Sequence, residues 1–243
     1  PGGAQGTGCA VTAVTRPEQT AGTTMSTADP AGAAGAADVA DVADVVVLAG
    51  GTGARLGGAS KPDVVARGAR LLDHVLAGVE RLREQGLALG RVCVVAPEEV
   101  ALPGDVLRAL EDPPLGGPVA GIAAGLELLG RCVPVAGLTG ILTCDAPSSW
   151  QVLPTLHRAL AKAGPELDGV CARDGEHTQY LLGLYRRRAL ATAVAPGGVP
   201  LRDTAVRRAL RPLRIAALPV SRDVVRDLDT WTEVRAWDAG RSE

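Results

Sequence analysis

Short apolar runs alternate with longer segments of helical periodicity from residue 44 onward. The runs are rich in Val and Leu with few polar positions, which is typical of buried parallel strands. They cover residues 45–49, 91–96 and 138–144. Elsewhere apolar residues recur every three or four positions, which predicts helices over 71–85, 119–129 and 150–163. This alternation predicts an α/β fold: a single three-layer α/β/α domain with a mostly parallel, Rossmann-like sheet.

Shorter elements complete the predicted fold. Apolar positions indicate strands over 169–172, 180–185 and 213–218, of which the first two could pair with each other. Apolar spacing predicts further helices over 102–110, 187–194, 203–210 and 230–237.

Residues 1–43 consist mainly of small and polar residues and hold almost no large apolar side chains. Such a segment buries too little surface to offset its conformational entropy. We therefore expect a disordered extension over 1–43, followed by a folded domain over 44–240. The chain contains one methionine, Met25, where we expect natural translation to begin.

The first apolar run leads into a glycine-rich loop, Gly50-Gly51-Thr52-Gly53-Ala54-Arg55-Leu56-Gly57-Gly58-Ala59-Ser60-Lys61-Pro62. Glycines let the backbone approach a ligand closely, so that successive N–H groups can point at one anion. Arg55 and Lys61 add positive charge to the same loop. These features predict a site for the phosphates of a nucleoside triphosphate; a glycine-rich connection without a ligand is the alternative.

Two better-known phosphate motifs do not fit this loop. A P-loop requires Gly-Lys-Ser/Thr, whereas Lys61 lies between Ser60 and Pro62. The dinucleotide fingerprint begins at Gly51 but has Leu56 where its last glycine belongs. A dinucleotide-dependent oxidoreductase is therefore the least favoured function.

The overall composition excludes broad classes of partner. The net charge is −2, so no basic surface indicates nucleic acid or an anionic membrane as a partner. No apolar run approaches the roughly 18 residues of a membrane span. The five cysteines show no metal-binding spacing and fall mostly within apolar strands, which indicates buried thiols in a reducing cytoplasm.

Asp145 directly follows the apolar run at 138–144. A carboxylate at the carboxyl end of a strand is well placed to bind Mg²⁺, which prefers oxygen ligands. Because Asp is also favoured at helix N-caps, capping of the helix after Ser148 is the alternative.

Asp112 precedes the helix opening Gly116-Gly117-Pro118. The free amides of such an opening and its small side chains would let a nucleotide base approach. An ordinary loop, with Gly121 and Gly125 serving close helix packing, is the alternative.

The pattern Leu48-Ala49-Gly50-Gly51-x-x-x-Arg55-x-Gly57-Gly58-x-x-Lys61 resembles the signature loop of sugar-nucleotide-type nucleotidyltransferases. Within them it is most similar to the molybdenum cofactor guanylyltransferases (MobA-like). Three further blocks are similar to this family: Gly117-Pro118-Val119-Ala120-Gly121, Cys144-Asp145-Ala146-Pro147 and Gln179-Tyr180-Leu181-Leu182-Gly183-Leu184-Tyr185-Arg186. The resemblance implies a fold of the nucleotide-diphospho-sugar transferase type. It also implies Mg²⁺-dependent transfer of GMP from GTP to the terminal phosphate of molybdopterin or molybdenum cofactor, with release of pyrophosphate.

The resemblance also implies roles for individual residues. Lys61, Arg55 and Asp145 are the expected catalytic residues, and Asp145 is the expected Mg²⁺ ligand. The nucleotide is expected to contact Leu48, Ala49, Gly50, Gly51, Thr52, Gly53, Lys61, Asp112, Gly117, Pro118 and Asp145. The acceptor is expected to contact Gln179, Arg202 and Asp227. Arg207 and Arg208 could meet the acceptor phosphate, or could simply be solvated.

The C-terminal segment departs from the family pattern. Asp227 and Asp229 replace two asparagines, and Trp231 replaces a proline. Because carboxylates repel a phosphate unless a cation lies between them, Asp227 or Asp229 is a candidate second metal ligand. Asp229 could instead cap the helix that begins near Thr230.

Two other functions remain open. The first is a related nucleotidyltransferase, either a CTP-using molybdenum cofactor cytidylyltransferase or an enzyme acting on a sugar phosphate. The second is a non-catalytic GTP-binding accessory protein. A cytoplasmic protein of any of these kinds could make transient contact with the proteins that mature molybdoenzymes.

Overall fold

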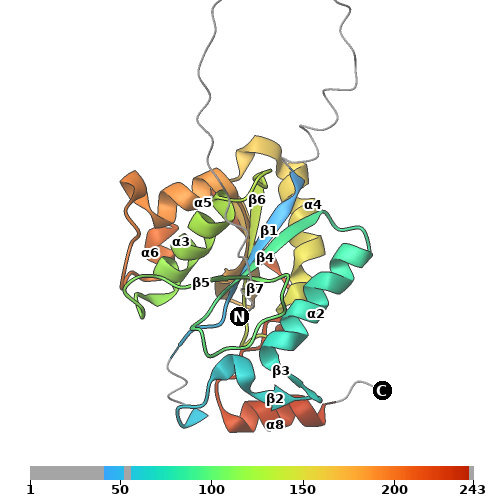
Figure 1. Ribbon diagram of the computed structural model, residues 1–243. Helices are drawn as coiled ribbons and strands as arrows, with labels where there is room; N and C mark the ends of the chain where they lie inside the picture. The colour runs from blue at the N-terminus through green and yellow to red at the C-terminus, as the bar shows by residue number, and fades with distance from the viewer. Residues whose placement is uncertain (1–40, 52–55, 241–243) are drawn as a thin grey trace, which may run out of the picture.

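The computed structural model describes residues 41–51 and 56–240, and they form a seven-stranded sheet with helices on both faces (Figure 1). The strand order is β5-β4-β1-β6-β8-β7-β9, and β8 is the strand that runs antiparallel to its neighbours. The strands are β1 Ala43–Leu48, β4 Leu89–Val95, β5 Leu107–Ala109, β6 Leu138–Thr143, β7 Gly169–Asp174, β8 His177–Arg186 and β9 Ile215–Pro219.

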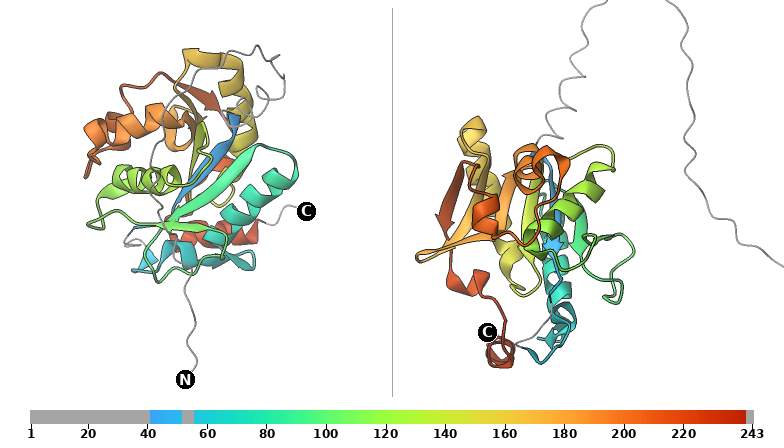
Figure 2. Two further views of the ribbon diagram at one scale, coloured as in Figure 1. Left: turned by 45° about the horizontal axis from the view of Figure 1, so that its top comes forward. Right: turned by 90° about the vertical axis from the view of Figure 1, so that its left-hand side faces the viewer.

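Two sets of helices cover the sheet, as Figures 1 and 2 show. One face carries α2 (Leu71–Glu84) and α4 (Leu153–Ala163); the other carries α3 (Gly117–Gly130), α5 (Arg187–Val194) and the short α6 (Val206–Ala209). Below the carboxyl ends of the parallel strands lie the hairpin β2 (Val65–Ala66) and β3 (Ala69–Arg70), and α8 (Trp231–Ala239). The remaining elements are η3 Lys61–Asp63, η4 Ser149–Val152, η5 Gly164–Glu166, η6 Pro196–Gly198 and α7 Arg222–Val225.

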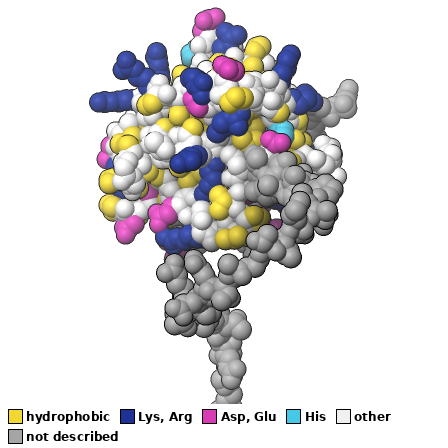
Figure 3. Space-filling view, turned by 90° about the horizontal axis from the view of Figure 1, so that it is seen from above, with side chains coloured by type: hydrophobic (Ala, Val, Ile, Leu, Met, Phe, Trp, Pro, Cys, Tyr) yellow, Lys and Arg dark blue, Asp and Glu magenta, His cyan; other side chains and the backbone are white. Residues whose placement is uncertain are grey.

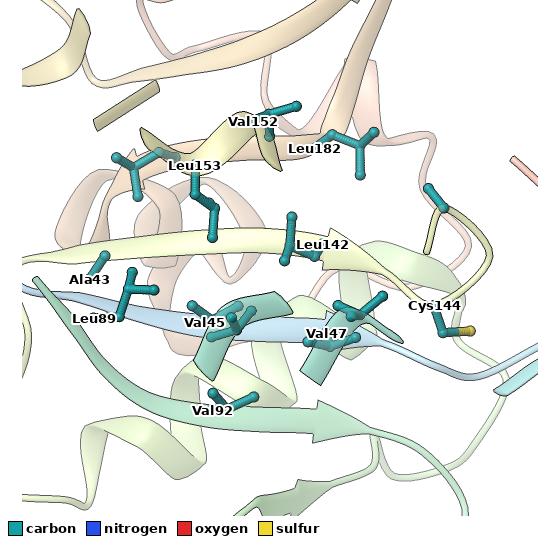
Figure 4. Packing of buried hydrophobic residues seen from close by; sticks show 14 of the residues in the cluster. Ala43, Val45, Val47, Leu89, Val92, Leu142, Cys144, Val152, Leu153 and Leu182 are labelled. Carbon is teal, nitrogen blue, oxygen red and sulfur yellow. The ribbon is translucent and has the colours of Figure 1, made fainter. Parts of the chain in front are cut away.

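The core is divided by the sheet because successive side chains of a strand point to opposite faces. Val45 and Val47 pack with Leu142 and Leu153 on the α2/α4 face, as Figure 4 shows. Val46 packs under α3 on the other face. Burial on both faces explains why the strands have continuous apolar sequences, and it confirms the predicted three-layer α/β/α fold with its mostly parallel sheet.

Most predicted elements are present, with boundaries that differ by a few residues. The helix predicted over 102–110 is wrong: this segment contains β5, whose Leu107 pairs with Cys93 of β4. Pro103 and Gly104 disfavour a helix there, and the open edge of β4 offers backbone pairing instead. The hairpin β2–β3 and α7 were not anticipated.

The predicted extension over residues 1–43 lies almost entirely outside the described residues, and β1 begins at Ala43. No helix in the described part of the chain is long and apolar enough to cross a membrane.

Tyr185 of β8 is a fully buried anchor of the antiparallel pair β7–β8. Gly169 and Gly183 leave room for its ring: a Cβ atom at Gly169 would lie 2.3 Å from Cδ1, and one at Gly183 would lie 2.6 Å from Cε2. The Tyr185 hydroxyl donates a hydrogen bond to the carbonyl oxygen of Tyr180 at 2.6 Å. Tyr185 therefore fixes the backbone of β8 around Tyr180.

This packing predicts the effect of a single methyl group. Gly169→Ala should lower the free energy of unfolding by about 1–3 kcal/mol, because the new Cβ would overlap a ring that cannot move. Gly104→Ala is the matched control, since a Cβ there meets nothing within 4 Å. Urea unfolding should separate the two variants; equal stability would contradict the described packing.

Candidate active site

Lys61 begins η3, the turn that follows the glycine-rich loop. Pro62 is buried in the first turn of η3, and the next residue, Asp63, accepts from the Arg70 guanidinium at 3.0 Å. Arg70 also forms two hydrogen bonds with Asp73, in the first turn of α2, at 2.7 and 2.9 Å. Arg70 therefore ties η3 to α2 and fixes the backbone that carries Lys61.

Lys61 lies between two carboxylates that come from distant parts of the chain. Its Nζ donates to Oδ2 of Asp145 at 3.0 Å and to Oδ1 of Asp229. The side chains are mostly buried, with exposed fractions of 18% for Lys61, 24% for Asp145 and 30% for Asp229. The backbone N–H of Leu228 donates to the carbonyl oxygen of Asp145 at 2.8 Å, which fixes the C-terminal segment against the end of β6.

The electrostatics of this group reflect an excess of negative charge. Desolvation lowers the pKa of Lys61, but the hydrogen bonds and charges of Asp229 and Asp145 outweigh it and raise the pKa to about 12. Desolvation raises the pKa of Asp227 to about 6, and the charges of Asp145 and Asp229 add to the increase. The carboxylates of Asp145 and Asp229 therefore repel the carboxylate of Asp227.

The described part of the chain contains no group of three or more His, Cys, Asp or Glu side chains that could hold a metal ion on its own. Asp145 and Asp229 nevertheless converge on one cation, the Lys61 ammonium. A divalent ion held there would need further oxygen ligands from a substrate or from water, which is how proteins usually bind Mg²⁺.

Thr230, not Asp229, caps the last helix. The Thr230 hydroxyl accepts from the Glu233 N–H at 3.3 Å, and the Glu233 carboxylate accepts from the Thr230 N–H at 2.8 Å, a capping box. The same carboxylate accepts from the Asp229 N–H at 3.0 Å. The cap therefore holds Asp229 in place and leaves its carboxylate for Lys61. Asp145 is likewise not a cap, because the N-cap of η4 is Ser148.

The first part of the glycine-rich loop lies at the end of β1. The Ala49 N–H donates to the Val95 carbonyl at 2.9 Å, so Leu48 and Ala49 continue the sheet, and Gly50 and Gly51 are exposed beyond it. Gly51 has φ +131°, a conformation that other L-residues rarely adopt. Thr52, Gly53 and Arg55 lie outside the described residues.

Asp112, Gly117 and Pro118 lie in and after the loop that leads into α3, and Arg202 joins them. The Arg202 guanidinium covers Gly116, where a Cβ would lie 2.6 Å from Cζ, and it donates to the Pro114 carbonyl at 3.3 Å. Asp112 and Arg202 line the same cavity of about 590 Å³. Arg202 was predicted as an acceptor residue, but its contacts are with the loop expected to bind the nucleotide.

The alternative reason for the glycines of α3 is also confirmed. A Cβ at Gly121 would lie 3.2 Å from Val95, and one at Gly125 would lie 3.0 Å from Val46. These two glycines serve close packing of α3 on the sheet. Gln179 lies opposite Ala172 in the β7–β8 pair, and its side chain forms no hydrogen bond with the described residues.

Three positioning residues were not predicted: Asp63, Arg70 and Glu233. Glu233 could have been found, because Thr230-x-x-Glu233 is a capping-box sequence. No sequence motif predicts the roles of Asp63 and Arg70. Their pairing depends on the hairpin β2–β3, which brings Arg70 back beside η3.

Comparisons with known proteins identify the family of this chain. The family model described as a MobA-like NTP transferase domain matches residues 45–217. The chain is 34% identical over 173 residues to the molybdenum cofactor guanylyltransferase of Pseudomonas syringae pv. syringae (strain B728a), covering 71% of this chain and 81% of that protein.

Two solved structures share the fold. The molybdopterin-guanine dinucleotide biosynthesis protein A of Archaeoglobus fulgidus matches with a TM-score of 0.57 and 20% identity, over 81% of this chain and 97% of that one. The 4-diphosphocytidyl-2C-methyl-D-erythritol synthase of Anaerococcus prevotii matches with a TM-score of 0.59 and 11% identity, over 84% and 97%.

The matched family model and the named relative thus identify the chain as a nucleotidyltransferase. This chain belongs to the MobA-like NTP transferase family.

The capping box gives a prediction for the segment that carries Asp229. Thr230→Ala should lower the free energy of unfolding by about 1 kcal/mol, because the helix loses its cap. Thr232→Ala is the matched control: it is the same substitution at an exposed position of the same helix. A urea titration that shows equal losses for the two variants would contradict the capping assignment.

Proposed function

We propose that this protein transfers GMP from GTP to the terminal phosphate of molybdopterin or molybdenum cofactor and releases pyrophosphate. The observation that carries the proposal is the Lys61–Asp145–Asp229 group at the carboxyl edge of the sheet, where ligands of open α/β sheets bind. The name of the Pseudomonas syringae relative supports the choice of GTP and of the acceptor.

The proposed reaction needs no nucleophile from the protein. An oxygen of the acceptor phosphate attacks the α-phosphorus of GTP, and the bond from that phosphorus to the pyrophosphate oxygen breaks. The cysteine beside Asp145 fits no covalent role: Cys144 is buried, and burial raises its pKa far above the ordinary value. Catalysis therefore rests on positioning and on neutralising charge.

Lys61 is the residue that we propose for the triphosphate. Its ammonium can exchange a carboxylate oxygen for a phosphate oxygen without leaving the site, because it already has two anionic partners. The exposed backbone at Gly50 and Gly51 would let phosphates approach the end of β1. Asp112, Gly117 and Pro118 would border the base and ribose, beside the Asp112–Arg202 cavity.

Asp145 and Asp229 fit a Mg²⁺ ion by the chemistry of their donor atoms. Mg²⁺ takes oxygen ligands and is commonly held by one or two carboxylates together with substrate phosphates and water. Both carboxylates are partly buried and already converge on a positive charge. When bound, the ion would neutralise charge on the triphosphate. Asp227, whose pKa is raised beside these carboxylates, would contact the acceptor together with Gln179.

The cysteines support a cytoplasmic location. Cys93, Cys132, Cys144 and Cys171 are all free thiols, and three of them are buried. Free buried thiols are the usual state in a reducing compartment. We also propose that the protein makes transient contact with proteins that mature molybdoenzymes.

Pyrophosphate release tests the reaction. The purified protein with Mg²⁺ and molybdopterin should release pyrophosphate with GTP, and not with ATP, CTP or UTP. Omission of the acceptor should stop release. Pyrophosphate release with CTP in place of GTP would indicate a cytidylyltransferase. Tight GTP binding without pyrophosphate release would indicate a non-catalytic accessory protein.

The chain itself supplies the control for Lys61, because it contains only two lysines, Lys61 and Lys162. Lys61→Ala should lower kcat/KM by a factor that corresponds to roughly 2–4 kcal/mol, the cost of losing one preorganised charge-stabilising donor. Lys162→Ala, an exposed residue of α4, should leave kcat/KM unchanged. Near-full activity of Lys61→Ala would remove Lys61 from the mechanism.

A further inference from the structure

A second concave surface lies beside α6, on the sheet face that is covered by α3 and α5. This cavity has a volume of about 740 Å³, within the range of roughly 300–1,000 Å³ that small-molecule sites occupy. Arg207, Arg208 and Arg211 line it together with Tyr180, Leu213 and Ile215. We call it the arginine cavity.

The three arginines of this cavity have no acidic partner. Their side chains form no hydrogen bond or ion pair within the described part of the chain, and no acidic residue lines the cavity. Other arginines of this protein are paired: Arg70 with Asp63 and Asp73, Arg83 with Glu80, Arg131 with Glu127, and Arg214 with Asp168. The three guanidinium groups are exposed, so solvent screens part of their mutual repulsion, and an anion bound between them would relieve the rest.

The charge is also local. The chain as a whole carries a net charge of −2, so three arginines around one cavity are a local excess of positive charge. Figure 3 shows, for the face seen from above, that Lys and Arg side chains gather in groups on the surface of this protein. A guanidinium presents its donors in a planar fork that matches phosphate oxygens in pairs, so three of them suit a ligand with more than one phosphate.

Apolar and aromatic side chains complete the lining of the arginine cavity. Leu213 and Ile215 are half-buried, and the neighbouring Leu210 is buried. Tyr180 is fixed through its backbone by the hydroxyl of Tyr185 at 2.6 Å. The apolar body or ring of a ligand can therefore pack on these side chains.

The arginine cavity shares no lining residue with the Asp112–Arg202 cavity, and none of Lys61, Asp145 and Asp229 lines it. Its residues Tyr180, Leu213 and Ile215 pack in the core under α3 and α5. Asp145 lies between Cys144 and Ala146, which belong to the core on the opposite face of the sheet, under α2 and α4. In Figures 1 and 2, α6 lies beside the sheet, whereas α8 lies below its carboxyl edge.

We infer that the arginine cavity is a second anion site that binds a small molecule bearing at least two neighbouring phosphate groups. The phosphates bind Arg207, Arg208 and Arg211, and the rest of the molecule packs on Tyr180 and Leu213. A site of this kind lets a phosphorylated metabolite bind without occupying the site of nucleotidyl transfer.

Calorimetric titration with inorganic pyrophosphate tests this inference. The titration uses the Lys61→Ala protein, so that binding at the candidate active site contributes little to the signal. We expect saturable binding of one pyrophosphate per chain, tighter than that of inorganic phosphate. Replacement of Arg207, Arg208 and Arg211 by alanine should weaken it by roughly one to two orders of magnitude, because charge-assisted hydrogen bonds are lost.

A charge-matched control uses Arg158, Arg188 and Arg235, which are exposed on α4, α5 and α8. Their triple alanine variant should bind pyrophosphate like the Lys61→Ala parent. The three single variants at Arg207, Arg208 and Arg211 should each weaken binding less than the triple variant. Equal affinity for both triple variants, or no pyrophosphate binding by the parent, would overturn the inference.

A competition experiment separates a small-molecule phosphate site from a docking surface for an acidic protein. Displacement of pyrophosphate by hexaglutamate at equal charge would overturn the inference in favour of an acidic protein partner. The titration requires no turnover, so it tests the second anion site independently of guanylyl transfer. A protein that is inactive with GTP but binds pyrophosphate at these arginines would still support the inference.

Discussion

The contact of Lys61 with Asp145 and Asp229 is the interaction on which the organisation of the site depends. It joins residues 84 and 168 positions apart along the chain: the turn after the glycine-rich loop, the end of β6 and the segment before α8. Each partner is held by other contacts, Lys61 through the Arg70–Asp63 pair and Asp229 through the Glu233 carboxylate. Because these supports are preformed, a triphosphate would meet charges that are already in place, which is the condition for electrostatic catalysis.

The same contact gives a physical meaning to the departure from the family pattern at 227–229. Amides at these positions would leave Lys61 with one anionic partner, whereas Asp229 gives it a second and Asp227 adds a nearby third carboxylate. Desolvation raises the pKa of Asp227 and the charges of Asp145 and Asp229 add to the increase; a divalent cation would relieve the repulsion between the three carboxylates. The arginine cavity carries the opposite imbalance, with three arginines around it and no carboxylate in its lining.

Much of this arrangement could be predicted from the sequence, and the failures have physical reasons. The buried strands and long helices followed from periodicity, and Lys61 and Asp145 followed from their place after strands. The helix predicted over residues 102–110 is wrong because apolar spacing alone fits a helix there. The pairing of β5 with the edge of β4 is a tertiary contact that this spacing does not show. The bond between Lys61 and Asp229 could not be foreseen, because local sequence does not show which distant segments meet. The arginine cavity could not be predicted for the same reason. Arginines on a helix are commonly solvated, and only the fold shows that these three line a cavity with Tyr180.

The sharing of Lys61 between carboxylates and nucleotide can be observed directly by NMR, since a protein labelled with ¹⁵N at lysine Nζ has only two such groups. Lys162→Ala assigns the second signal. We predict that the Lys61 ammonium gives a protected signal distinct from that of Lys162, that Asp229→Asn changes it, and that GTP with Mg²⁺ shifts it while the Lys162 signal stays in place. A Lys61 signal that matches a solvated lysine and does not respond to GTP would contradict the central role given to this residue.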